Sequence, residues 1–383
     1  MKLSKKIRHI IRWLTPFGVV HWYTRNHPKE HPVQKIFSSE QIFVSDFKKY
    51  VSEQKYVTFE NQSPFETVVA VQGFGYSGSG AVVDLLREYD NTLVIGSVDY
   101  EGSVASRDKH CEEVDILRLA GGLFEVEKYL GSNNIFQNDA LLHRVVAQIA
   151  NSDIYESIPS VHPYFYEYLR QICSIVSDSP RDQYYNQFLD YRGNNDIFFL
   201  NSIPIHKYRE ICRGLLNSIF SIIKGDDKCP ILVLDQFVGD VEFDVNRYLD
   251  YIPNLKILTV YRDPRDVYLF AKLNNVEWIP HTMIEMFIDW YKVLTKNFNI
   301  NETEKYHVVQ FEQLLDDYDD VVSSIEKFVG TTSLNHARKA TCLDVNVSKK
   351  NKSLWMQNNS RYAEYDFINK ELKQFCYCNK QYE

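Results

Sequence analysis

The chain has 383 residues, of which 44% are hydrophobic and 25% are charged. These fractions exclude a disordered or fibrous protein, and the length suffices for one large α/β domain or two small ones with a sizeable core. The formal net charge is −8, yet the first thirty residues carry seven Lys or Arg and one Glu, which leaves −14 for the rest. This balance does not favour nucleic acid as a partner.

The cysteines and histidines predict neither a disulfide framework nor a metal site. The seven cysteines contain no CxxC pair and are scattered, apart from Cys376 and Cys378. Such spacing is typical of reduced thiols in a cytosolic chain. The eleven histidines form no HExxH or HxH pattern, so we expect no metal cofactor.

Residues 2–14, KLSKKIRHIIRWL, predict a basic amphipathic helix. Charged side chains interrupt its apolar run, so we do not expect a cleaved secretory signal, and the segment is too short to span a bilayer. The helix could lie on an anionic membrane surface or pack on its own domain. We therefore predict a cytoplasmic protein, with peripheral attachment to the inner face of the membrane as one alternative, and an extension over 16–64.

The strongest local signal is FETVVAVQGFGYSGSGAVVDLL, from Phe65 to Leu86. An apolar β-branched run, a glycine-rich loop and an apolar pattern of helical period predict a strand, a phosphate-binding loop and a helix. Glycines let the backbone curl so that several N–H groups and the helix N-terminus point at one anion. The alternative is a glycine turn that binds no ligand.

Two familiar nucleotide ligands can be weighed from the loop alone. Gly73, Gly75 and Gly78 fit GxGxxG, and Asp99 follows a second apolar run, as in a dinucleotide site. That pattern keeps a dinucleotide-dependent oxidoreductase as a rival.

A nucleoside triphosphate is less well matched. Ser79 and Gly80 occupy the positions where such a loop has Lys and Ser/Thr. Without these side chains, hydrolysis of ATP or GTP is not predicted.

A third interpretation rests on a resemblance. The segment from Gly73 to Gly80 resembles the GxPKSGTT loop of sulfotransferases, with Ser77, Gly78, Ser79 and Gly80 in the SGTT positions. In that family the loop binds the 5′-phosphosulfate of 3′-phosphoadenosine 5′-phosphosulfate (PAPS). The resemblance implies a donor site that also includes Gly75 and Tyr76, with PAP as the product.

A second motif, LKILTVYRDPRDVYLFAKL over 255–273, resembles the 3′-phosphate-binding strand and helix of the same family. Arg262 matches the arginine that grips the 3′-phosphate, and an Arg beside a helix N-terminus suits that role. A surface turn with local ion pairs is the alternative for Arg262 alone. The two motifs in this order favour the sulfotransferase.

Other segments follow in the family's order. CPILVLD over 229–235 predicts a buried central strand, and 306–330 resembles the family's next strand and helix. Residues 348–355 look like the basic loop that folds over the donor. This resemblance implies that the phosphates are covered by Lys349, Lys350, Asn351 and Lys352, whereas a solvated loop is the alternative.

The resemblance also supplies candidates for the general base. Glu113 lies in a stretch similar to the one that provides the carboxylate base in Golgi heparan-type sulfotransferases, and Glu112 and Asp115 lie close to it. Cytosolic members use a histidine, and His110 and His162 are the possible substitutes in this chain.

Two positions depart from the family's pattern. Tyr76 stands where a Lys or Arg bridges the transferring sulfonate, so that role would fall to a C-terminal lysine or to a hydrogen bond from the Tyr76 phenol. Phe270 stands where a serine contacts the 3′-phosphate. A catalytically inactive nucleotide-binding or membrane-associated protein is therefore the second rival.

We predict a three-layer α/β fold with a mostly parallel sheet and a P-loop-like core. Residues 1–64 would form an N-terminal helix and extension, and residues 65–383 would form the sulfotransferase domain. Residues 132–225, rich in aromatic and amphipathic patterns, are predicted to form a helical insertion on the acceptor side. The acceptor would be a hydroxyl of a glycan or of a lipophilic alcohol such as a sterol.

Overall fold

The computed structural model describes residues 32–96, 109–110, 122–131, 134–176, 196–238, 245–296, 303–357 and 363–377. The predicted helix over 2–14 and the candidate base Glu113 lie outside these ranges, as do Glu112, Asp115 and Asp99.

A six-stranded parallel sheet forms the centre of the protein, in the order β3-β2-β6-β1-β7-β8. Its strands are β1 (Thr67–Gly73), β2 (Thr92–Gly96), β3 (Lys109–His110), β6 (Ile231–Asp235), β7 (Leu255–Tyr261) and β8 (Tyr306–Gln310). The central strands are apolar along almost their whole length because both faces of the sheet are covered by helices.

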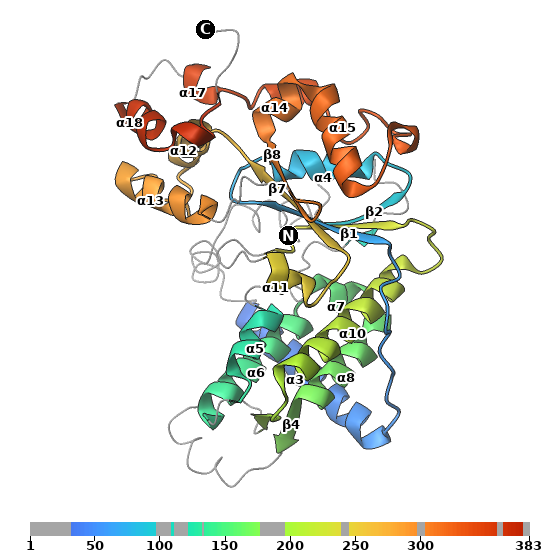
Figure 1. Ribbon diagram of the computed structural model, residues 1–383. Coiled ribbons are helices and arrows are strands. Elements are labelled where there is room, and N and C mark those ends of the chain that lie inside the picture. Colours follow the sequence, from blue (N-terminus) through green and yellow to red (C-terminus); the bar gives the residue numbers. More distant parts are fainter. Residues whose placement is uncertain are drawn as a thin grey trace, which may run out of the picture.

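Side chains of β1 alternate between two hydrophobic clusters, as the two-residue period of a strand requires. Val69 and Val71 pack in one cluster, beneath α4 (Ser79–Arg87), α14 (Phe311–Asp316) and α15 (Tyr318–Val329). Val68 and Ala70 belong to the opposite cluster. Figure 1 shows α4, α14 and α15 together on one side of the sheet and the larger group of helices on the other.

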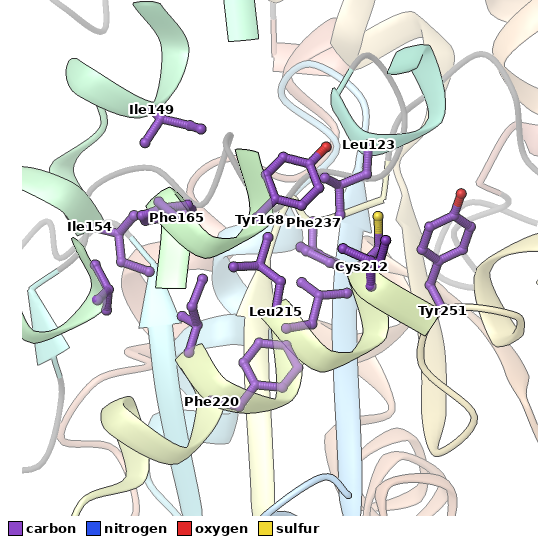
Figure 2. Packing of buried hydrophobic residues seen from close by; sticks show 14 of the residues in the cluster. Leu123, Ile149, Ile154, Phe165, Tyr168, Cys212, Leu215, Phe220, Phe237 and Tyr251 are labelled. Atoms are coloured by element: carbon purple, nitrogen blue, oxygen red, sulfur yellow. The ribbon is translucent and has the colours of Figure 1, made fainter. Parts of the chain in front are cut away.

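The larger group contains α3 (Pro32–Glu53), α5 (Phe124–Tyr129), α6 (Ile135–Ala150), α7 (Asp153–Ser157), α8 (His162–Ile172), α10 (Ile205–Lys224) and α11 (Val245–Leu249). An antiparallel hairpin of β4 (Cys173–Val176) and β5 (Ile197–Leu200) lies beside them. In the cluster drawn in Figure 2, Phe165 of α8 and Leu215 of α10 are buried side chains.

The segment over 16–64 is interpreted above as an extension, but from Pro32 onward it contains α3. Phe43, Val44 and Phe47 of this helix are buried in the same cluster as Phe165 of α8. This part of the N-terminal segment therefore contributes to the core of the helical region.

A third cluster joins α12 (Pro264–Asn274), α13 (Ile284–Thr295) and α18 (Ala363–Glu371). Two short helices, α16 (Val345–Lys349) and α17 (Leu354–Gln357), and two 3₁₀ turns, η4 (Ser333–Asn335) and η5 (Lys373–Phe375), also lie in the C-terminal part. The predicted three-layer α/β fold with a mostly parallel sheet is thus confirmed. Within the described ranges, no helix combines the length and apolar character that a bilayer span requires.

Candidate functional site

Four neighbouring strands end at one cavity of about 560 Å³. Asp235 and Gln236 come from the end of β6, the loop 73–80 follows β1, Arg262 follows β7, and Phe311 follows β8. Ligands of parallel α/β sheets bind at this carboxyl edge. The cavity therefore brings the two sequence motifs together.

The loop places the N-terminus of α4 at the cavity. Gly78, the residue before α4, has φ +87°, and a Cβ atom there would lie 2.3 Å from the ring of Phe311. Glycine is thus required by both the left-handed backbone and the close approach. The Ala81 N–H donates to the Gly78 carbonyl at 3.1 Å and closes the turn. The start of α4, at Ser79 and Gly80, lines the cavity, where a helix N-terminus favours an anion.

Two serines of the loop differ in their surroundings. Ser77 is 2% exposed, and within the described part of the chain its hydroxyl has no hydrogen-bond partner. Ser79 Oγ donates to the side chain of Gln236 at 2.9 Å, and the Gln236 amide donates to the carbonyl of Gly73 at 2.8 Å. Gln236 therefore fixes the loop, whereas Ser77 offers an unused hydroxyl to a ligand.

Arg262 is 5% exposed at the end of β7. Its guanidinium donates at 3.4 Å to the Tyr76 carbonyl and at 3.4 Å to Asp266, and it also donates to the Asn351 carbonyl. Among the described residues, nothing accepts a hydrogen bond from its Nε. The first two contacts are long, so this buried cation keeps donor capacity for an anionic group.

Two buried carboxyl groups lie at this motif: Asp266 pairs with Arg262, and Glu312 contacts the residue after Arg262. Asp266 accepts the Trp355 N–H at 3.0 Å, and burial raises its pKa to about 6. Glu312 accepts the Asp263 N–H at 2.9 Å, and burial followed by the nearby charge of Asp263 raises its pKa to about 8. The motif after β7 is thus a buried network and not a surface turn.

The lysines predicted to cover the phosphates do not line the cavity; Ser348 and Asn351 of that segment do. Lys349 and Lys350 are exposed, and Lys352 forms an ion pair with Asp316. Asp316, the last residue of α14, holds the Lys352 ammonium in this ion pair. The basic pattern of the segment does not reveal this partner, so the sequence alone did not predict where the Lys352 side chain lies.

An aromatic wall, made of Tyr76, Phe270 and Trp278, closes another side of the cavity. The Tyr76 ring centroid lies 4.2 Å from that of Phe270 and 5.8 Å from that of Trp278. Gly75 makes room for this wall, since a Cβ atom there would lie 1.9 Å from Trp278. Tyr76 and Phe270, the two residues that depart from the family's pattern, therefore contact each other. Burial raises the pKa of the Tyr76 phenol, so the phenol stays protonated and can donate a hydrogen bond at neutral pH.

The predicted histidine does not reach the site. His162 Nε2 lies 2.7 Å from the Tyr155 carbonyl, and its ring stacks on that of Tyr155 with centroids 3.7 Å apart. It is absent from the cavity lining. His110 is placed only as a residue of β3.

Sequence reasoning missed Asp235, Gln236, Phe311 and Trp278. The first two could have been found, because the predicted strand over 229–235 ends there at the carboxyl edge. Among the described residues, no cluster of three or more His, Cys, Asp or Glu is suited to a metal ion.

No protein-family model matches the chain, and no curated protein matches its sequence. The sulfotransferase domain of a Synechococcus olefin synthase is similar in structure, with 11% identity and a TM-score of 0.40 over 85% of this chain and 99% of that one. A sulfotransferase from Mycobacterium tuberculosis has 12% identity and a TM-score of 0.35 over 82% of this chain and 81% of its own. One from Mycobacterium avium has 12% identity and a TM-score of 0.33 over 93% and 80%.

Proposed function

We propose that this protein is a sulfotransferase that moves a sulfonate group from PAPS to an acceptor hydroxyl. The observation that carries the proposal is the meeting of an anion-binding loop and a buried arginine in one cavity. PAPS has anionic groups at both its 5′ and 3′ ends, and two separate anion sites suit such a donor.

The residues present fit this donor. The loop amides, the α4 N-terminus and the free hydroxyl of Ser77 would hold the 5′-phosphosulfate. Arg262 would hold the 3′-phosphate through its remaining donors. When bound, PAPS supplies the activated sulfonate; Gly75 to Gly80 and Arg262 position it and stabilise the negative charge left on the phosphate.

The loop lacks the family's cation, and the Tyr76 phenol is the nearest replacement that the loop offers. Its positive φ of 59° and its contact with Phe270 fix the side chain at the cavity. As a protonated donor it would contribute a hydrogen bond to the transferring group, at less electrostatic strength than a lysine.

The aromatic wall supports an acceptor with an apolar or ring-shaped face. Trp278 is 46% exposed although it lines the cavity, so a ligand would bury further apolar surface there. Phenols, sterols and the CH-rich faces of sugars satisfy this requirement, and the acceptor hydroxyl would be presented from this side.

Calorimetry with PAP, NAD and ATP tests the donor. We expect PAP to bind, and Arg262→Ala to weaken it by about tenfold or more, as for loss of hydrogen bonds to a charged group. Arg144→Ala, which removes an exposed arginine on α6, is the control. Tight NAD binding without PAP binding would point instead to a dinucleotide enzyme, and radiolabelled PAPS offered with glycans, sterols and phenols would identify the acceptor class.

A further inference from the structure

Sulfonate transfer to a hydroxyl requires a group that accepts the hydroxyl proton. Among the described residues, the cavity lining contains two carboxylates, Asp84 and Asp235. Asp84 lies on α4, and Arg87 donates to it at 2.6 Å. That ion pair ties the Asp84 carboxylate to α4, whereas Asp235 ends a central strand of the sheet, so Asp235 is the carboxylate that the sheet itself positions.

The backbone around Asp235 is held firmly. Asp235 is the last residue of β6 and lies opposite Val71 of β1, two residues before β1 ends at the loop. The next residue donates its N–H to the Val71 carbonyl at 2.9 Å. A carboxylate at the end of a central strand keeps its place better than one on a loop.

The side chain of Gln236 links this strand end to the donor loop. It bridges the Gly73 carbonyl and the Ser79 hydroxyl, so any ligand on the loop lies beside the end of β6. Asp235 also lines the same cavity as the aromatic wall, from which the acceptor hydroxyl would approach. The proton acceptor and the two substrates would therefore share one space.

We propose that Asp235 is the general base of the transfer; this inference rests on the proposed function. The acceptor oxygen forms a bond to the sulfonate sulfur while its proton passes to an Asp235 carboxylate oxygen. The bond between sulfur and the 5′-phosphate oxygen breaks, and its electron pair stays on that oxygen. The proton then leaves Asp235 for water, and the site is restored.

Asp235→Asn tests the role, because the amide keeps the size of the side chain and cannot accept the proton. Turnover is read as release of PAP from PAPS, with water alone and with naphthol as acceptor. We expect a loss of about 100-fold or more, with PAP affinity within about twofold of wild type. Asp235→Glu should recover part of the rate. Asp226→Asn, the same change at an exposed residue before the opposite end of β6, is the matched control.

Two results would overturn the base role while leaving the donor site in place. One is an unchanged rate in Asp235→Asn. Loss of turnover in Glu113→Gln would then return the role to the carboxylate that the sequence suggests. The other is an equal loss of PAP affinity and rate, which would make Asp235 part of the donor site. Failure of the wild-type protein to bind PAP would instead remove the proposed function itself.

Discussion

Glu312 is a fully buried carboxyl group in the network below Arg262. Its pKa, raised to about 8 from 4.5, means that the folded protein keeps this proton up to pH values at which the unfolded chain has released it. The folded state therefore binds more protons than the unfolded state across that interval. The stability that this proton contributes is full below pH 4.5 and is lost as pH rises through about 8.

We expect the free energy of unfolding to fall with rising pH over this interval, by at most about 1.4 kcal/mol per pH unit from this one group. Glu312→Gln keeps an acceptor for the Asp263 N–H and does not titrate, so its slope should be shallower. Urea denaturation at several pH values measures both slopes. Glu66→Gln, at an exposed residue just before β1, is the control, and equal slopes in the wild-type and Glu312→Gln proteins would contradict the expectation.

At the scale of elements, the C-terminal segment is fastened to the start of α12. The Tyr377 N–H donates to Asp263 at 2.9 Å, and Arg265 donates to the Tyr377 carbonyl at 3.0 Å. Arg265 also pairs with Asp263 at 2.6 Å and lies 3.9 Å over the ring of Trp355. The motif after β7 thus both presents Arg262 and holds the segment that contributes Asn351 to the cavity.

Arg265→Ala should destabilise the protein by about 3–5 kcal/mol, because the Asp263 carboxylate would remain buried without its cationic partner. We expect faster hydrogen exchange at the Tyr377 amide as the segment loosens. Arg144→Ala, which breaks an exposed pair with Glu125, should cost less than about 1 kcal/mol. Unchanged exchange at Tyr377 would show that the segment is held by other contacts.

The elements also show what could be read from the sequence. The strand, loop and helix from 65 to 86 were predictable because a β-branched run, spaced glycines and a helical period all agree locally. Residues 132–225 were predicted to form a helical insertion, but α8 ends at Ile172 and residues 173–176 pair with β5. That pairing is tertiary, and it prevails over the local helical period.

Within the site, the predictable residues are those carried by a local motif, namely the loop and Arg262. The contact between Tyr76 and Phe270 joins two distant segments, and the partner of His162 is a backbone carbonyl. Asp235 is a single acidic residue after an apolar run, and nothing in its neighbours marks it. The place of such residues in or outside the site becomes known only from the folded structure, in which the ends of parallel strands lie together.

At the scale of the whole molecule, charge is distributed unevenly. The first thirty residues carry seven basic side chains and one Glu, whereas the remaining chain is acidic. A basic amphipathic segment contributes about 1 kcal/mol per Lys or Arg to binding an anionic membrane surface. We propose peripheral membrane association through residues 2–14.

Deletion of residues 1–15 should weaken binding to anionic lipid vesicles at low salt, because it removes five basic side chains. Vesicle sedimentation of the full and shortened chains measures the difference, and vesicles of neutral lipid serve as the control. Equal partition of the two chains would indicate that the segment packs on its own domain.

The convergence of four strand ends on one cavity also bears on folding. The groups around the cavity are spread from Gly73 to Asn351 along the chain, so none of them is near its partners until β6, β1, β7 and β8 are paired. Only the assembled sheet would then bind the donor, and a fragment of the chain would not. A ligand present at 100 times its Kd would add about 2.7 kcal/mol to the stability of the whole domain. The proposed donor would then stabilise the fold in addition to serving as a substrate.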